Sequence, residues 1–543
     1  MPTSRLILAL VLTISGTLPI FAQVDTAWVR RYNGPGDGHD EAKAVAYDDS
    51  GNVFVTGASF GAGTNDDYVT IKYKPNGDNA WVRRYNGPGN WVDRVTDVAV
   101  DTGGNVIVTG YSYGGVTDFD WVTIKYLPNG DTGWVRIHDG NASGSDGGQA
   151  IAVDDSGNVY VAGNVTTFHF VSFTTNYDYL TIKYLPNGDV AWARTYNAPG
   201  DSADIAWDIA LDDSGNVFVT GEAWNLSPLY WQYTTLKYSS AGTLLWDRHY
   251  SGNDPDQYYE GANAIAVSGS GNVYVTGTSN YDTSLYFSDY ATIRYYPNGD
   301  TAWVRRYNYP FNYIDGALDI DVDASGNSYV TGFSYGFLFD YATVKYLPNG
   351  DTGWVRRYYG TGFDENDGGQ ALVVDDSGNV YVTGNSWRAH PSDSGYDYAT
   401  IKYKPNGDTA WTRVYDGPAS SDDIANDIVV DPSGNVYVTG YSTGIGTSGD
   451  VTTIKYTQCS AKAGDANASG TYTLGDAIAI VNYVFSKPGC VPLPTCWLSG
   501  LLCRGDWNGT GTVTLGDAIR AVNYIFNKPG GPWDALPIGV CCL

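Results

Sequence analysis

Two twelve-residue segments near the C-terminus carry oxygen-bearing side chains at the spacing that binds Ca²⁺. The first runs from Asp465 to Asp476 and the second from Asp506 to Asp517. Each offers such side chains at positions 1, 3, 5, 9 and 12, glycine at position 6, and a backbone carbonyl at position 7. Each loop runs into a segment with helical apolar spacing that stops at Lys-Pro-Gly. The spacing predicts two calcium ions.

The duplicated loop and helix resemble a type I dockerin domain over about residues 463–530. The resemblance implies these calcium ligands: Asp465, Asn467, Ser469, Thr471 and Asp476 in the first loop, and Asp506, Asn508, Thr510, Thr512 and Asp517 in the second. Position 5 is usually Asp in dockerins but is Ser469 and Thr510 here, which predicts weaker calcium affinity. Turns that bind no metal remain the alternative interpretation.

A partner also follows from this resemblance. Dockerins bind cohesin modules and commonly tether polysaccharide-degrading enzymes, so a cohesin-like partner and a link to polysaccharide breakdown are implied. Leu474 and Leu515, just before the last ligand of each loop, lie on the expected partner surface.

The ends of the chain and its charge predict where the protein works. Residues 1–22 read as a signal peptide, with Arg5, an apolar run over 6–12, and Ala22 at the cleavage site. The six cysteines all lie within residues 458–543, which predicts disulfides formed in an oxidising compartment. We therefore expect a secreted protein, extracellular or cell-surface associated, without membrane insertion. The net charge of −28 argues against nucleic acid as a partner.

An internal repeat fills the chain between these ends. A Gly-Asn pair that opens an apolar strand recurs every 52 to 58 residues, at Gly51, Gly104, Gly157, Gly215, Gly271, Gly326, Gly378 and Gly434. Each copy contains four segments rich in Val, Ile, Thr and Tyr, called A to D here. In the second copy we expect them at 97–101, 105–112, 120–126 and 134–137. Tight-turn sequences join A to B and C to D. Four strands at this period predict one propeller blade.

The ends of the repeat array indicate how the ring closes. A D-type strand at 28–32 precedes the first copy, whereas the eighth copy stops after its C strand at Tyr456. The N-terminal strand should therefore complete the last blade and leave no open edge. We expect an all-β, eight-bladed propeller over residues 24–457, plus a small helical calcium-loop domain. The repeat resembles that of secreted bacterial β-propeller (SBBP) proteins, although that family's name implies seven blades.

Strand alternation places the long B–C loops on one face of the ring, opposite the tight turns. These loops are the predicted ligand-binding region, because they vary in length and carry aromatic side chains. Those over 166–177, 222–232 and 385–396 contain these candidate ligand-binding residues: Phe168, Trp224, Trp231, Trp387 and His390. Exposed rings would stack on sugars, so polysaccharide is a possible ligand. In the alternative interpretation they pack onto their own loops.

Three residue ladders recur in every copy. Eleven residues before each key glycine stands an acid: Asp40, Asp93, Asp146, Asp204, Glu260, Asp315, Asp367 and Asp423. These acids either ring the channel mouth and hold a cation or accept backbone N–H groups that fix the interblade link. A basic residue in strand C and an arginine two residues after the strand-D tryptophan also repeat. We expect them to pair with acids or to stack on aromatic rings.

No catalytic constellation emerges from the repeats. Four G-x-S-x-G matches all fall at the end of strand B, whereas a hydrolase elbow requires a strand-to-helix turn. The near-equivalence of the blades favours a non-catalytic binding or scaffolding propeller tethered through its dockerin-like module. The alternative is a polysaccharide-degrading enzyme, a glycoside hydrolase or lyase, with its site on the B–C face.

Overall fold

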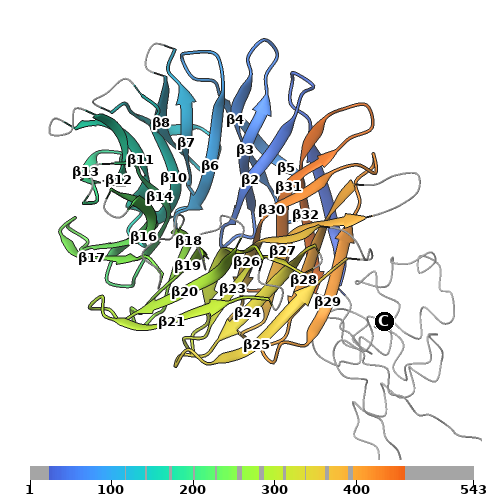
Figure 1. The fold of residues 1–543 in the computed structure, drawn as a ribbon. Helices are drawn as coiled ribbons and strands as arrows, with labels where there is room; N and C mark the ends of the chain where they lie inside the picture. Colours follow the sequence, from blue (N-terminus) through green and yellow to red (C-terminus); the bar gives the residue numbers. More distant parts are fainter. Residues whose placement is uncertain are drawn as a thin grey trace, which may run out of the picture. The chain divides into compact units, whose positions relative to one another are not determined.

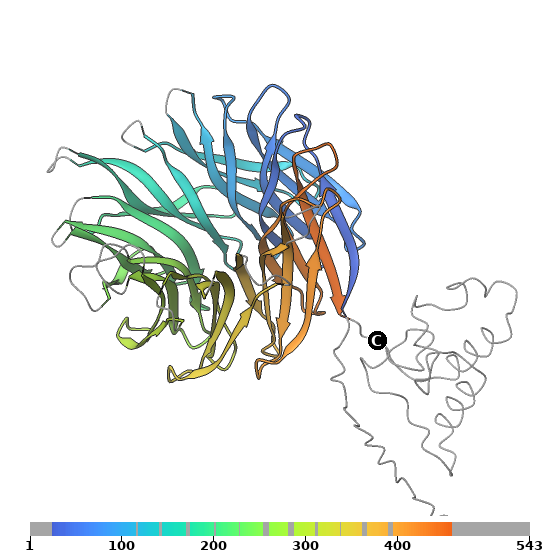
Figure 2. The same ribbon diagram turned by 45° about the vertical axis from the view of Figure 1, so that its right-hand side comes forward.

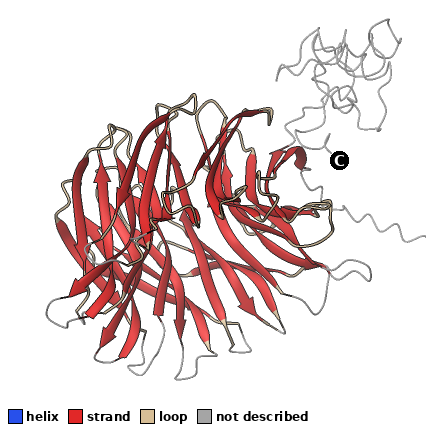
Figure 3. Ribbon diagram, turned by 90° about the horizontal axis from the view of Figure 1, so that it is seen from above, coloured by secondary structure: helices blue, strands red, loops and turns tan. Residues whose placement is uncertain are grey.

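The computed structural model describes residues 24–458, except 116–117, 141–143, 170–173, 200–201, 227–228, 253–259, 281–286, 310–312, 337, 361–365 and 389–394. The predicted signal peptide, all ten calcium ligands, Leu474, Leu515, His390 and the cysteines lie outside the described residues. The described part consists of strands and connecting loops (Figures 1 and 3). It contains no helix that is long and apolar enough to cross a membrane.

Eight four-stranded antiparallel sheets form the blades of a β-propeller. The innermost strands are β2 (Asp40–Tyr47), β6 (Asp93–Val100), β10 (Gly147–Val153), β14 (Asp204–Leu211), β18 (Glu260–Val267), β22 (Asp315–Val322), β26 (Asp367–Val374) and β30 (Asp423–Val430). The second strands are β3 (Val53–Phe60), β7 (Val106–Tyr113), β11 (Val159–His169), β15 (Val217–Leu226), β19 (Val273–Asn280), β23 (Ser328–Tyr335), β27 (Val380–Arg388) and β31 (Val436–Thr443). The inner strands begin about four residues earlier than the sequence indicates, at the ladder of acids.

The outer half of each blade completes the sheet. The third strands are β4 (Asp66–Tyr73), β8 (Phe119–Tyr126), β12 (Thr174–Tyr184), β16 (Leu229–Tyr238), β20 (Ser288–Tyr295), β24 (Phe339–Tyr346), β28 (Gly395–Tyr403) and β32 (Gly449–Gln458). The outermost strands are β5 (Asn79–Tyr85), β9 (Thr132–His138), β13 (Val190–Tyr196), β17 (Leu244–Tyr250), β21 (Thr301–Tyr307), β25 (Thr352–Tyr358), β29 (Thr409–Tyr415) and, in the eighth blade, β1 (Val24–Tyr32). Blades are numbered from 1 (β2–β5) to 8 (β30–β32 with β1).

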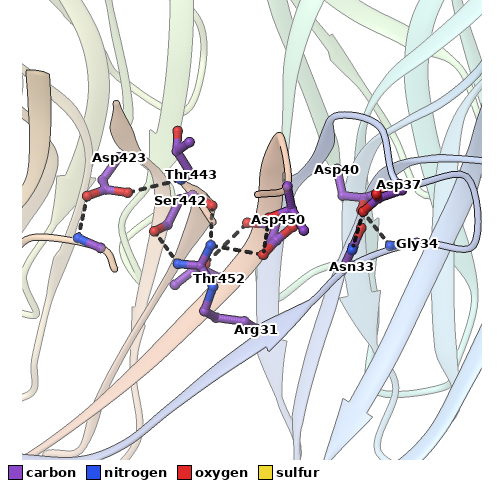
Figure 4. Close-up of polar contacts among 12 residues, drawn as sticks. Arg31, Asn33, Gly34, Asp37, Asp40, Asp423, Ser442, Thr443, Asp450 and Thr452 are labelled. Atoms are coloured by element: carbon purple, nitrogen blue, oxygen red, sulfur yellow. Dashed lines mark hydrogen bonds and ion pairs between the residues drawn. The ribbon is translucent and has the colours of Figure 1, made fainter. Parts of the chain in front are cut away.

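The N-terminal strand closes the ring, as predicted. The eighth sheet has the order β1-β32-β31-β30, and β1 lies beside β32 in Figures 1 and 2. The Arg31 guanidinium donates to the carbonyl of Ser442 (2.6 Å) and to Asp450 (2.9 Å), and also contacts the Ser442 hydroxyl (Figure 4). Arg84 makes the same contacts within blade 1, to Ser59 and Asp67. The seam therefore repeats the side-chain contacts of a continuous blade.

The hydrophobic core lies between neighbouring blades. Phe54, Tyr68 and Trp81 of blade 1 pack with Val106 and Val122 of blade 2, and all five side chains are buried. Equivalent clusters of buried side chains lie between blades 2 and 3, 3 and 4, 4 and 5, 5 and 6, and 6 and 7. Because the two middle strands of each sheet are covered on both sides, they are buried almost throughout, without the strict alternation of a sheet exposed on one face.

In seven blades a tryptophan and an arginine of the outermost strand bind the C–D turn of the next blade. The indole N–H of Trp28 donates to the Pro75 carbonyl (3.2 Å), and Arg30 donates to the Gly77 carbonyl (2.5 Å). The same arginine lies over the Trp28 ring, 5.7 Å from its centroid. Gly77 has φ +83°, and an added Cβ would meet Trp28 at 2.8 Å, so this turn requires glycine. The predicted stacking is confirmed for these members of the arginine ladder: Arg30, Arg83, Arg136, Arg194, Arg248, Arg305 and Arg356.

Candidate functional site

The described residues of the predicted B–C loops in blades 3, 4 and 7 are strand. In blade 3 the ladder between β11 and β12 continues to the His169–Thr174 pair, and in blade 4 that between β15 and β16 continues to Leu226–Leu229. In blade 7 it continues to Arg388–Gly395. The expectation of irregular loops over these residues is therefore wrong in extent. The cause is that alternating apolar and polar side chains prolong the hairpin ladder beyond the propeller face.

The candidate tryptophans sit on these hairpins in facing positions. Trp224 is directly opposite Trp231, with ring centroids 5.4 Å apart and planes at 72°. Trp387 is opposite Tyr396, at 4.9 Å and 77°. Phe168 lies on β11 and is partly exposed. Each tryptophan thus packs against its own hairpin while part of its ring stays open to solvent.

Three further aromatic side chains on this face escaped the sequence analysis. Trp91, Tyr313 and Tyr359 are 55%, 47% and 63% exposed. They lie in the links from an outermost strand to the next inner strand, which emerge on the same face as the long hairpins. Sequence analysis singled out only the B–C loops because those vary most in length. A search for aromatics in every link of that face would have found them.

The seven aspartates of the acid ladder accept backbone N–H groups that fix the interblade links. Asp40 accepts the backbone N–H of Gly34 (2.5 Å) and of Phe60 (2.8 Å), and is fully buried. Asp93 repeats this with Gly87 (2.7 Å). Burial raises the pKa of Asp40 despite these hydrogen bonds. Of the two predicted roles, the structure supports the acceptance of backbone N–H groups.

A β-bulge interrupts every inner strand at the same position. In blade 4 the register shifts between Ala206 and Asp208, which leaves Trp207 as the extra residue. The eight bulge residues are Lys43, Thr96, Gln149, Trp207, Asn263, Leu318, Gln370 and Asn426. We call this set the bulge ring, because neighbouring inner strands contact one another all the way round. It stands eight residues before each key glycine and differs in chemistry from blade to blade.

Directly after the bulge, aspartate and alanine alternate around the ring. The residues are Ala44, Asp97, Ala150, Asp208, Ala264, Asp319, Ala371 and Asp427. Each aspartate accepts the N–H of the next residue in its own strand and the N–H of the matching residue in the following blade. Asp97, for example, accepts from Val98 (2.7 Å) and Ile151 (2.8 Å). The four carboxylates have eight oxygens, and each oxygen accepts one backbone N–H group. The donors are the residues that directly follow this column, one in each blade.

The alternating aspartates have raised pKa values. Loss of hydration raises the pKa of Asp97 to about 8, and of Asp208 and Asp427 to about 6. The neighbouring carboxylates of Asp427 and Asp208 add repulsion at Asp97. The hydrogen bonds from backbone N–H groups act in the opposite direction, because they favour the charged form.

One group of carboxylates has the spacing of a metal site. Oxygens of Asp397, Asp416 and Asp423 lie within 4.8 Å of one another. The Arg388 guanidinium contacts Asp416 (2.5 Å) and Asp397 (3.4 Å), and Asp423 accepts the N–H of Gly417. Arg388 already pairs with two of the three carboxylates and a backbone N–H binds the third, so these residues do not fit a metal ion.

The tight-turn face carries two equivalent grooves of about 320 and 480 Å³, between blades 1 and 2 and between blades 3 and 4. In the first, Lys72 lies beside Asp48 (3.9 Å) and also donates to the carbonyl of Pro128 (3.3 Å). The lysine of each groove belongs to the basic ladder of strand C. These lysines contact the neighbouring blade, so we place the candidate ligand-binding residues on the opposite face, which bears the long hairpins.

Comparison with known proteins identifies the repeat. The family described as Beta-propeller repeat (SBBP) matches residues 134–164 and 417–446. No curated protein matches the chain. Similar solved structures include the periplasmic gluconolactonase of Pseudomonas aeruginosa, with 13% identity over 65% of this chain and 96% of that one, and a TM-score of 0.36.

Two other structures are similar at the same level. One is a PL25 ulvan lyase, with 12% identity over 80% of this chain and 94% of that one and a TM-score of 0.36. The other is a Dyadobacter fermentans protein of unknown function, with 10% identity over 81% of this chain and 100% of that one and a TM-score of 0.37. None of the three assigns an activity to this chain. Two segments of the eight-bladed propeller thus match the SBBP β-propeller repeat.

Proposed function

We propose that the chain is a secreted, non-catalytic carbohydrate-binding propeller, tethered through its calcium-dependent dockerin-like module to a cohesin-like partner. One observation carries the binding role: exposed aromatic rings gather on the face that bears the long hairpins. Trp91, Tyr313 and Tyr359 join the hairpin tryptophans there. Flat apolar rings with polar edges suit sugar rings, which present C–H groups on their faces and hydroxyls around their rims.

The hairpins supply a geometry suited to an extended ligand. The Trp224–Trp231 pair of blade 4 packs edge to face, and both residues are partly exposed to solvent. The Trp387–Tyr396 pair does the same on blade 7, three blades further round. Rings held by cross-strand packing lose little conformational freedom on binding, which favours affinity. A polysaccharide chain lying across the face would contact both hairpins.

The carboxylate cluster beside Trp387 is the observation that favours the second candidate, a glycoside hydrolase or lyase. Asp416 is exposed, whereas Asp397 and Asp423 are buried. Glycosidases need two carboxylates free to act as acid and as base or nucleophile. Because Arg388 pairs with Asp416 and Asp397, and Asp423 holds a backbone link, these groups are engaged in structural contacts. The binding function is therefore preferred.

A glycan array probed with the full chain tests the proposal. Wild-type protein should bind polysaccharides without releasing products, and Trp224→Ala with Trp231→Ala should weaken binding at least tenfold. Tyr296→Ala is the matched control, because Tyr296 is 47% exposed on the tight-turn face. Release of shortened products that Asp416→Asn abolishes would establish the enzymatic alternative. Binding by no glycan would overturn the carbohydrate role.

A further inference from the structure

The bulge ring has the composition of a small binding site. Its residues are the extra residues of the inner strands, and each is the third or fourth residue of its strand, counted from the hairpin face. Trp207 is 38% exposed although it belongs to an innermost strand, and Lys43 is also exposed. An inner strand that packs on both neighbours normally buries its aromatics. A solvent-facing indole here therefore needs a reason other than packing.

Several polar groups of the bulge ring are available to a ligand. Within the described part of the chain, the Trp207 indole N–H has no protein acceptor, and no other ring packs against it. Asn263 uses its amide N–H to hold the Ala317 carbonyl (2.7 Å), and Asn426 likewise holds that of Ala42 (2.7 Å). These bonds fix the two amides through their nitrogen atoms, so the amide oxygens remain as acceptors.

Two glutamines repeat this arrangement on opposite sides of the ring. The amide N–H of Gln149 in blade 3 donates to Asn164 (3.5 Å), and that of Gln370 in blade 7 donates to Asn385 (3.4 Å). Both side-chain oxygens again accept nothing from the described chain. The bulge ring thus combines one indole, a free N–H donor and four amide acceptors that the next blade or strand holds in place.

We propose that the bulge ring binds the end of an uncharged saccharide chain, with Trp207 as the stacking platform. The amide oxygens accept hydroxyl protons, and the indole N–H donates to a hydroxyl or ring oxygen. The bulge residues belong to the innermost strands, whereas the aromatic pairs lie on hairpins that extend beyond them, so we expect a chain end and not the middle of a chain to reach the bulge ring. This inference rests on the proposed carbohydrate-binding function and gives it end specificity.

The layer of aspartates explains why the ligand should be uncharged. Asp208 follows Trp207 directly, and Asp427 follows Asn426. At pH 7.5 these two carboxyls are largely ionised, because the pKa of each is about 6. A uronic acid placed in the bulge ring would face this negative charge. The one cation of the ring, Lys43, is already paired with Glu41 (2.6 Å).

The test compares the full chain and its variants on soluble oligosaccharides of two to four sugars, neutral or uronic, and on the polysaccharides that the wild type binds. Trp207→Ala should weaken binding of neutral oligosaccharides at least tenfold while polysaccharide retention through the hairpins persists. Trp207→Phe, which keeps a stacking face, should recover part of the affinity. Tyr296→Ala is the control, because Tyr296 is also an exposed aromatic residue but lies on the tight-turn face, away from the bulge ring and the hairpins.

The outcomes separate the two proposals. If the wild type binds glycans and both Trp207 variants match it on short oligosaccharides, the bulge-ring site is overturned while the carbohydrate role stands. If uronic oligosaccharides bind as well as neutral ones, the role given to the aspartates is wrong. If the wild type binds no glycan, the proposed function fails and takes this inference with it. Melting curves of the Trp207 variants show whether a loss of binding reflects unfolding.

Discussion

The Asp427 carboxylate accepts the backbone N–H of Val45 at 2.7 Å and so joins the last blade to the first. The other oxygen of the same carboxylate accepts the N–H of Ile428 in its own strand (2.7 Å). The contact that closes the ring is thus the same contact that Asp97, Asp208 and Asp319 make between interior blades.

Replacing Asp427 by alanine should destabilise the propeller without changing its fold. Four blades already carry alanine at this position, so the backbone accommodates it. The substitution leaves the N–H groups of Val45 and Ile428 without their acceptor, at an expected cost of about 2–4 kcal/mol in the free energy of unfolding. Urea denaturation measures the loss, with Asp376→Ala, an exposed turn acid, as control. Equal stability of the two variants would contradict the role of the carboxylate.

The aspartates also predict how stability depends on pH. Burial raises the pKa of folded Asp97 to about 8, above its unfolded value of 3.8, so the folded state binds this proton more tightly. Its contribution to stability is complete below about pH 4 and is lost as the pH rises through about 8. The free energy of unfolding of the wild type should therefore fall between pH 5 and pH 8. In Asp97→Ala this decline should be shallower, and an unchanged slope would argue against titration of Asp97.

The seam should depend on Arg31 more strongly than an interior blade depends on Arg84. Both arginines contact a serine and a buried aspartate, but a tight turn ties β5 to β4, whereas no turn joins β1 to β32. Arg31→Ala leaves the Asp450 carboxylate, which is 6% exposed, without its cationic partner, at a cost of about 3–5 kcal/mol in the free energy of unfolding. Hydrogen exchange should show earlier opening of β1 in Arg31→Ala than of β5 in Arg84→Ala.

Deletion of residues 24–33 should lower the melting temperature and solubility sharply.

Calcium binding by the C-terminal module is testable on the full, oxidised chain. Each loop places carboxylates at positions 1 and 12, which repel one another until calcium binds, so calcium should order the following helices. Calorimetry should find two calcium ions per chain and weaker affinity than for loops with a third carboxylate. Asp465→Ala combined with Asp506→Ala should remove both ions. If calcium at millimolar concentration neither binds nor changes the helicity of the wild type, the dockerin-like interpretation fails.

The length of the sequence repeat and the residues of its turns were enough to predict the blades. The Gly-Asn and Pro-Asn-Gly turns mark each hairpin, and the unequal chain ends reveal that β1 completes blade 8. The bulge ring could not be predicted, because an extra residue changes the register without leaving a turn signal in the sequence. Trp207 therefore looked like any apolar strand residue. The alternating aspartates become visible only when the column seven residues before each key glycine is compared between blades.

That alternation sets a parity rule for the molecule. Every aspartate of this column accepts N–H groups from its own blade and from the following one, so the repeating structural unit is a pair of blades. Removing a blade that carries aspartate would place two alanines side by side and leave backbone N–H groups without an acceptor. Removing a blade that carries alanine would make two carboxylates compete for the same N–H group. Such a ring can gain or lose repeats at low cost only two at a time. An engineered six-bladed version should therefore fold more readily than a seven-bladed one.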